Sequence, residues 1–267
     1  FRMLVLLSCA KTMSAVSKVK VPLTTSPRFQ KEAAEIALQM SQFSVDELER
    51  LLRVNAKIAV ENYKRYQAFH AEATPELPAL LAYTGIVFKR LNPKDFSAED
   101  FGCAHEHFVL TSFCYGLLRP LDVIRAYRLE GDVVLPELGN QTLFSYWRSR
   151  LTDTFIEDIR SAGGILCNLA SDEMKSLFDW KRVESEVRVV TPEFHVWKNG
   201  KLATIVVYTK MSRGEMTRFI LKNKIGNPEE LKGFSWEGFE FDESLSDEKK
   251  LVFINGMGAV SYTHLRA

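Results

Sequence analysis

Short apolar runs separated by helix-forming segments constrain the fold of this 267-residue chain more than any other feature of its sequence. Met3–Leu7, Ile165–Leu169 and Leu251–Ile254 are apolar stretches of the length that buried strands have. The segments between them are rich in Ala, Leu, Glu, Gln and Lys, which favour helices. Because strands and helices interleave along the chain, we predict an α/β or α+β fold in which helices flank a mixed central sheet.

The same patterns predict where the other elements lie. Residues 28–72 are predicted to form helices, with breaks near Gln42–Asp46 and Val54-Asn55. At the first break, Ser44 and Glu47 have the spacing of a capping box. The other predicted helices cover 97–108, 142–161 and Ser212–Lys224. The other predicted strands cover Ala79–Thr84, Val187–Val190, Phe194–Trp197 and Leu202–Tyr208, with Asn199-Gly200 as a hairpin turn.

Residues 3–255 are predicted to form a single domain, because no repeat, low-complexity tract or Pro/Gly-rich linker divides them. Residues 256–267 have no pattern that continues the preceding strand, and we expect them to be a non-native tail. Leu6-Leu7-Ser8-Cys9 resembles a lipoprotein cleavage site, but the apolar run before it is shorter than the roughly 7–15 residues of a signal peptide. A buried strand is therefore favoured, and no segment has the length of a membrane span.

Charge and cysteine spacing limit the functions that this chain can have. The formal net charge is +1, so binding to nucleic acid would require cations concentrated on one face. The four cysteines form no C-x-x-C pair, which disfavours a zinc ribbon, and their scatter indicates a reducing compartment. His105-Glu106-His107 is a poor chelate because residues two apart on a helix point to different faces. No metal site and no cofactor are predicted.

The segment Lys210–Glu215 is a candidate phosphate-binding corner. Ser212 and Glu215 have the spacing of a capping box at the start of the predicted helix, where backbone N–H groups are free. Cations surround this helix start, and a glycine permits close approach of a ligand to the backbone; these residues are Lys210, Arg213, Arg218 and Gly214. The alternative is a solvated basic face on an ordinary helix.

A second polar set lies within an apolar stretch, at Arg119 and Arg128. Arginine in such a context pairs with a carboxylate or a phosphate, because a buried charge without a partner is costly. The alternative is therefore a structural ion-pair network with the acids Asp122, Glu130, Asp172 and Glu173. The functional interpretation is one basic cleft, lined by Lys11, Arg119, Arg128, Lys210, Arg213 and Arg218. Ligands of α/β folds collect beyond the carboxyl ends of strands, which several of these residues follow.

Four motifs, in this order and spacing, resemble the YaaA family. They are Ser8-Cys9-Ala10-Lys11-Thr12, the run from Tyr115 to Asp122 with Tyr127-Arg128-Leu129-Glu130, Asn168-Leu169-Ala170-Ser171-Asp172-Glu173, and Lys210-Met211-Ser212-Arg213-Gly214-Glu215-Met216. The similarity covers about Met3 to Ile254. Cys9 stands where the family usually has Pro, and Met174 stands where it usually has an aromatic residue.

The resemblance implies a cytoplasmic bacterial protein of the hydrogen peroxide stress response that binds DNA and limits iron-driven damage. It also implies that residues 34–66 form a helix-hairpin-helix element, in which Arg53 and Lys57 would contact DNA phosphates without reading bases. The alternative for this segment is an ordinary helical pair with solvated charges. Its acidic residues leave its net charge small, so composition alone does not predict DNA binding there.

An enzyme acting on a nucleotide or nucleobase is the main alternative function. Lys11, Tyr115, Asp172 and Glu173 are its candidate catalytic residues, and a carboxylate near cations can serve as a general base. A simple DNA binder has little need for carboxylates inside a basic cleft, because they would repel phosphate, and this favours the enzyme. A small anionic or nucleotide ligand is its predicted partner. A structural protein with a solvated charge network is a third possibility. No known catalytic motif decides among them.

Overall fold

The computed structural model describes residues 3–256, so the tail predicted over 256–267 lies outside the described residues apart from Gly256. A mixed sheet forms the centre of the molecule, and its strand order is β11-β12-β13-β9-β8-β1-β3-β4. The strands from β13 to β3 run parallel: β13 (Lys250–Asn255), β9 (Arg188–Lys198), β8 (Ile165–Asn168), β1 (Met3–Leu7) and β3 (Phe108–Ser112). Every residue of the central strand β1 is buried, as its apolar run predicts.

Antiparallel strands complete the two edges of the sheet and one projecting hairpin. They are β4 (Gly116–Leu118), β12 (Phe239–Phe241), β11 (Ser235–Trp236) and β10 (Lys201–Ala203), the last of which pairs with β9. Two small ribbons pair β2 (Leu77–Pro78) with β5 (Val123–Ile124), and β6 (Val134–Leu135) with β7 (Gln141–Thr142). The mixed α/β fold predicted from the sequence is confirmed.

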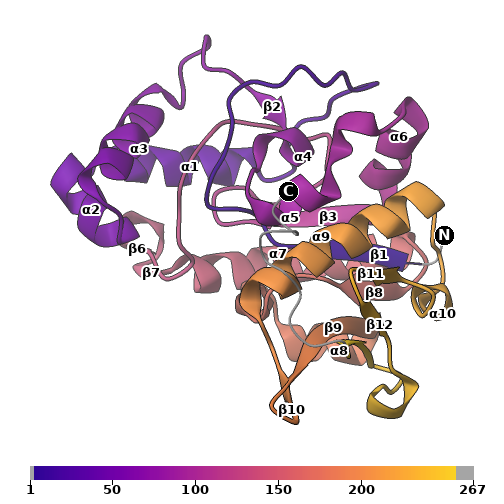
Figure 1. The fold of residues 1–267 in the computed structure, drawn as a ribbon. Helices are drawn as coiled ribbons and strands as arrows, with labels where there is room; N and C mark the ends of the chain where they lie inside the picture. Colours follow the sequence, from indigo (N-terminus) through magenta and orange to yellow (C-terminus); the bar gives the residue numbers. More distant parts are fainter. Residues whose placement is uncertain (1–2, 257–267) are drawn as a thin grey trace.

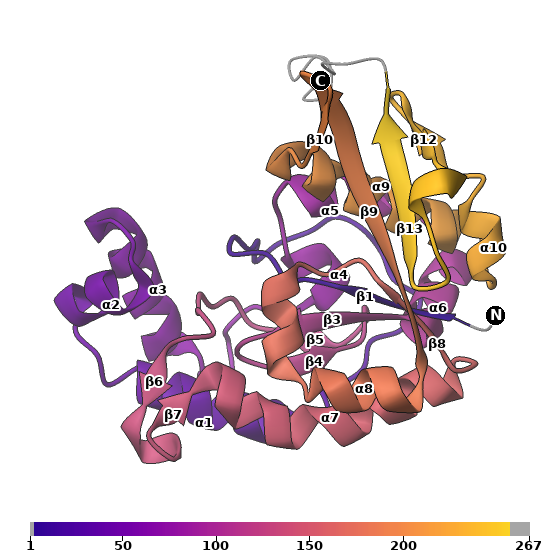
Figure 2. The same cartoon turned by 90° about the horizontal axis from the view of Figure 1, so that it is seen from below.

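Helices cover both faces of the sheet (Figure 2). On one face, α7 (Leu143–Ser161) packs on β1, β4 and β8, and α8 (Trp180–Glu186) packs on β9. On the other face lie α4 (Ala79–Ala82), α5 (Ile86–Leu91), α6 (Ala98–His107) and α9 (Val206–Asn223). The remaining helical turns are α10 (Pro228–Leu231), η1 (Pro93–Asp95), η2 (Pro136–Leu138), η3 (Asp172–Leu177) and η4 (Glu243–Leu245).

The segment predicted to be helical between residues 28 and 72 forms α1 (Gln30–Met40), α2 (Val45–Leu52) and α3 (Ala56–Ala68). Helices α2 and α3 project away from the sheet as a helical arm (Figures 1 and 2). The predicted capping box starts α2, where Ser44 and Glu47 bond each other's backbone N–H groups. At the link to α3, the N–H groups of Arg53 and Val54 are already bonded to Arg50 and Glu49 carbonyls. A phosphate-binding hairpin in residues 34–66 is therefore not confirmed.

Two strand predictions, Ala79–Thr84 and Leu202–Tyr208, are wrong, and two others are confirmed but belong to a single strand. Ala79–Thr84 begins with the short helix α4, because a short apolar run of Ala and Leu suits a helix as well as a strand. Val187–Val190 and Phe194–Trp197 are parts of one strand, β9, which pairs with β8 up to Val190 and with β13 from Thr191 onward. Pro192 lies in the part of β9 that pairs with β13, opposite Leu251. Of the strand predicted over Leu202–Tyr208, only the first two residues belong to a strand, β10, and α9 begins at Val206.

Among residues 3–256, no helix combines the length and apolar character needed to cross a bilayer.

Candidate functional site

The sheet has a topological switch point between β1 and β8. These neighbouring strands are parallel, so their carboxyl ends lie at the same edge. The chain leaves β1 toward β3 on one side, whereas it leaves β8 toward β9 on the other. Because the two connections run in opposite directions, a crevice opens beyond the strand ends, and α/β sheets bind ligands in such crevices.

A pocket of about 430 Å³ occupies this crevice. Its volume lies within the range of roughly 300–1,000 Å³ that small-molecule sites have. The ends of three strands, the loop before β6, helices α5 and α9 and the turn η3 contribute to its wall. The lining residues include Leu7–Thr12 after β1, Phe113 after β3, Tyr127–Leu129, Leu169, Ser171, Glu173 and Met174 after β8, Thr84–Phe88 at α5, and Lys210 and Arg213 of α9.

Hydrogen bonds between the loops fix the floor of this switch-point pocket. The backbone N–H of Ser171 donates to Ser8 Oγ at 2.9 Å, which ties the loop after β8 to the loop after β1. The N–H of Thr84 donates to the carbonyl of Thr12 at 3.0 Å, and their hydroxyls are 2.8 Å apart. Gly85 then starts α5 with φ at +107°, a conformation that a side chain would strain. The wall is therefore held by bonds between segments distant in sequence.

Four cations line the pocket, and most of them have no protein counter-charge. Arg213 is half-buried, and within residues 3–256 its guanidinium makes no hydrogen bond or ion pair; burial lowers its pKa. Arg128 Nε is buried and has no hydrogen-bond partner in the described part of the chain. Lys210 is exposed and unpaired among these same residues, whereas Lys11 pairs with the buried Glu130 at 3.0 Å. The pocket therefore presents positive charge that an anion can neutralise.

One carboxylate, Glu173, also lines the pocket. Burial raises its pKa, and the neighbouring Glu130 raises it further, while Lys11 acts in the opposite direction. Arg53, at the end of α2, pairs with Asp132 at 2.9 Å, and both lie within electrostatic reach of Glu173. The helical arm therefore approaches the acidic side of the pocket.

The thiol of Cys9 also lines the pocket, but it is not a reactive group. Burial raises its pKa to about 12, although a hydrogen bond with Thr111 lowers it in part. At neutral pH the thiolate is scarce, and the thiolate is the reactive form.

The prediction of a single basic cleft is wrong for Arg119. Its guanidinium contacts the fully buried Asp122 at 3.0 Å and the carbonyl of Ser26 at 3.1 Å, away from the pocket. Asp122 also accepts a hydrogen bond from Thr25 at 2.6 Å, so this arginine neutralises a buried carboxylate that holds the 23–26 segment in place. Arg119 thus belongs to a structural ion-pair network, which is the alternative given above for this residue.

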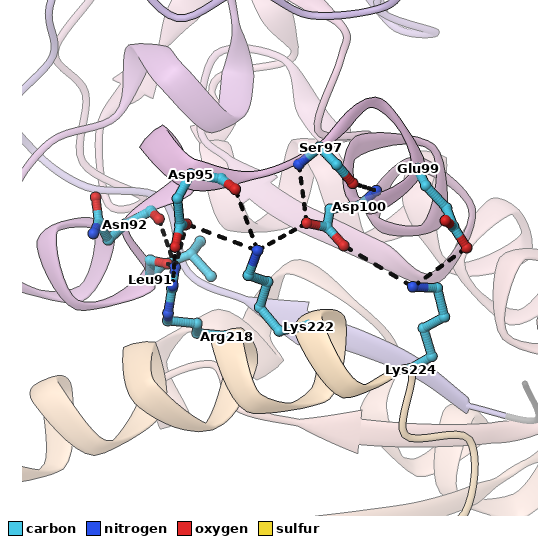
Figure 3. A network of polar contacts seen from close by, with 9 residues as sticks. All are labelled: Leu91, Asn92, Asp95, Ser97, Glu99, Asp100, Arg218, Lys222 and Lys224. Carbon is cyan, nitrogen blue, oxygen red and sulfur yellow. Dashed lines mark hydrogen bonds and ion pairs between the residues drawn. The ribbon is translucent and has the colours of Figure 1, made fainter.

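Arg218 also lies outside the pocket, within a polar network between α9 and the η1–α6 region (Figure 3). It contacts Asp95 at 2.5 and 2.9 Å and the carbonyl of Asn92 at 2.7 Å. Further along α9, Lys222 contacts Asp100 at 2.9 Å. These contacts hold α9, which carries Lys210 and Arg213, against the rest of the molecule.

The helix start predicted at Ser212 is wrong, because α9 begins at Val206. Ser212 is buried inside the helix, where its hydroxyl donates to the carbonyl of Tyr208 and accepts from Trp236 Nε1. Gly214 faces α5 instead of a ligand: a Cβ there would lie 2.3 Å from the carbonyl oxygen of Val87. The cations of this segment thus reach the pocket from the side of a helix and not from its N-terminus.

The remaining predicted residues are scattered. Tyr115 is buried, and its hydroxyl accepts from the N–H of Arg125, away from the pocket. Asp172 is exposed and pairs with Lys175 at 3.3 Å, so of the candidate catalytic residues only Lys11 and Glu173 line the pocket. Lys57 is exposed on the helical arm. Within residues 3–256, no group of three or more His, Cys, Asp or Glu side chains is placed to hold a metal ion.

Several lining residues were not predicted as site residues, notably Ser8, Thr12, Thr84 and Ser171. Their signal was present in part, since each lies just after a predicted strand or at the end of one. The sequence does not show that these strand ends meet at one place in the fold.

Comparisons with known proteins agree along nearly the whole chain. A family model described as peroxide stress protein YaaA matches residues 3–245. A UPF0246 protein of Bacteroides thetaiotaomicron is 97% identical over 256 residues, covering 96% of this chain and 100% of the relative. UPF0246 proteins of Porphyromonas gingivalis and Crocosphaera subtropica are 51% and 37% identical, each over 94% of this chain and over 99% and 100% of their own lengths.

Proposed function

The chain belongs to the peroxide stress protein YaaA family, and from this premise we propose that it acts in the response to hydrogen peroxide by binding DNA. Lys210, Arg213 and Arg128 would bind backbone phosphates at the mouth of the switch-point pocket. Lys57 on the helical arm would add a further contact. Such contacts give affinity without base readout.

The observation that carries this proposal is the shortage of protein partners for the pocket cations. The guanidinium of Arg213 and Nε of Arg128 have none within the described residues, whereas Arg119, Arg218 and Arg53 are each paired with a carboxylate. Guanidinium groups bind phosphate oxygens through planar pairs of hydrogen bonds. A chain with a net charge of +1 can bind a polyanion if its unpaired cations share one face.

We expect Arg213→Ala to weaken binding of duplex DNA by roughly 10- to 100-fold, the loss of a charge-assisted hydrogen bond pair. The measurement is fluorescence anisotropy of a labelled duplex, repeated from low to high salt. Lys201→Ala, which removes an exposed cation on β10 outside the pocket, is the matched control. Equal affinities for the two variants, or an affinity that does not change with salt, would exclude DNA binding by the pocket.

A further inference from the structure

The pocket has a cationic end formed by α9. Arg213 and Lys210 lie one helical turn apart on α9 and line the same wall, and neither has a partner within residues 3–256. Asp172 is the charged neighbour whose field acts on Arg213, and it is exposed. Two adjacent cations without a buried counter-charge suit a phosphate group.

Most of the remaining wall is apolar. Leu7, Val87, Phe88, Phe113, Leu129 and Met174 line it. A phosphate ion would fill a small part of about 430 Å³ and would leave these side chains in contact with water. The fitting ligand therefore has an apolar or aromatic body attached to its anionic group.

The acidic end of the pocket has hydrogen-bond acceptors. Glu173 enters the wall from η3, after β8, and has Lys11 and Glu130 as charged neighbours, whereas Arg213 and Lys210 enter it from α9. The carboxylate and the guanidinium therefore belong to different elements of the wall. The Ser8 and Ser171 hydroxyls line the wall as well. A carboxylate accepts hydrogen bonds from amino and ring N–H groups of a nucleobase.

We infer that the switch-point pocket takes one nucleotide unit, with its phosphate at Arg213 and Lys210 and its base between the apolar walls near Glu173. This inference rests on the proposed DNA binding and specifies how DNA engages the protein. A duplex cannot enter a pocket of this size, so the unit is a strand end, a free mononucleotide or a nucleotide extruded from the stack.

The test compares ligands that carry one or both parts of a nucleotide. Calorimetric titration of the full chain uses dGMP, deoxyguanosine and inorganic phosphate. We expect dGMP to bind at least about tenfold more tightly than either fragment, because it alone contacts both ends of the pocket. Arg213→Ala should lower dGMP affinity roughly 10- to 100-fold. Ala10→Leu, which fills the pocket without removing a charge, should lower it as well, and Lys201→Ala should not.

A second measurement identifies the source of the nucleotide. A duplex carrying 2-aminopurine at a mismatch should increase in fluorescence when the protein extracts that base from the stack. A fluorescence increase that disappears in Ala10→Leu assigns the pocket to an extruded nucleotide. Binding of dGMP without any increase assigns it to free nucleotides or strand ends, and either result supports the single-nucleotide site.

The proposal fails in a way that differs from failure of DNA binding. If the duplex binds but dGMP does not and the fluorescence is unchanged, the nucleotide site is refuted and DNA binding survives. If inorganic phosphate binds as tightly as dGMP, the pocket is a simple anion site. If neither DNA nor dGMP binds, both proposals are refuted.

Discussion

At the scale of single residues, the partners of each charged side chain separate structural groups from candidate ligand groups. Arg119 and Arg218 hold carboxylates and backbone carbonyls, and Arg53 holds Asp132, so their charge is already neutralised. Arg213 and Lys210 have no such partner among residues 3–256. The same helix, α9, therefore contains a ligand candidate, Arg213, and a structural residue, Arg218, five positions apart.

Glu173 should make the binding of an anion sensitive to pH. Its pKa is raised by burial and by Glu130, so it takes up a proton at a higher pH than an exposed glutamate does. Protonation removes a negative charge from the pocket, so DNA affinity should rise as the pH falls from 7 to 5. Glu173→Gln keeps an oxygen that accepts hydrogen bonds but loses the negative charge, so it should bind DNA more tightly at pH 7 and show a flatter pH profile, as measured by anisotropy at constant ionic strength. Identical profiles for the variant and the wild type would contradict this role.

The raised pKa of Glu173 also makes its contribution to stability depend on pH. A carboxyl whose pKa is raised in the folded state favours folding when it is protonated, and that contribution is lost as the pH rises through the folded pKa. Removing the charge of Glu173 should therefore leave the fold intact at neutral pH. Glu173→Gln is thus suited to binding measurements.

At the scale of elements, the pocket wall depends on the contact between α5 and α9. Gly214 permits this contact because it has no Cβ, and a Cβ there would lie only 2.3 Å from the carbonyl oxygen of Val87. Val87 and Arg213 both line the pocket, so the distance between these helices sets the position of the cationic wall. The network of Arg218, Lys222 and Asp95 holds α9 further along the same face, since Arg218 lies four residues after Gly214 and donates to the carbonyl of Leu91 at the end of α5 (Figure 3).

Gly214→Ala should force the two helices apart and destabilise the protein by roughly 1–3 kcal/mol, the usual effect of overpacking. Denaturant unfolding measures this change. Gly102→Ala is the matched control, since Gly102 is inside α6 and its added Cβ would meet nothing within 4 Å. That variant should be more stable than the wild type by about 0.5–1 kcal/mol. Equal destabilisation of both variants would show that the α5–α9 contact is not tight.

At the scale of the whole molecule, the helical arm and the pocket differ in charge. Residues 34–66, which include most of the arm, contain five basic and five acidic side chains, so this segment has no net charge. Lys57 and Lys64 are exposed on it, while Arg53 and Arg65 are paired with Asp132 and Glu61. Arg50 is exposed on α2 as well, so any phosphate contact by the arm would come from this arginine and these two lysines.

Lys57→Ala should lower DNA affinity modestly and equally for all sequences, because a phosphate contact carries no base information. The slope of log affinity against log salt should become less negative by about 0.9, the effect of one lost phosphate contact. Anisotropy titrations at several salt concentrations measure both quantities, with Lys201→Ala as the control. An unchanged slope would mean that DNA does not reach the arm.

The fold was predictable from local patterns wherever those patterns were unambiguous. Met3–Leu7, the 142–161 helix and the Ser44–Glu47 capping box are confirmed, because each depends on residues close together in the sequence. The strand predicted over Leu202–Tyr208 failed because Val206 and Val207 are apolar in either state. Packing against the sheet and α5 stabilises helix there in spite of their β-branched side chains.

The sequence alone determined that polar segments follow buried strands and that several cations lie in those segments. Tertiary structure alone decided which cations pair with acids and which remain unpaired. Arg218 meets Asp95 across 123 positions of the chain, and Arg53 meets Asp132 across 79, while Arg213 meets no acid in the described residues. Local patterns depend on near neighbours and can be read directly, whereas an ion pair depends on where distant segments come together in the folded chain.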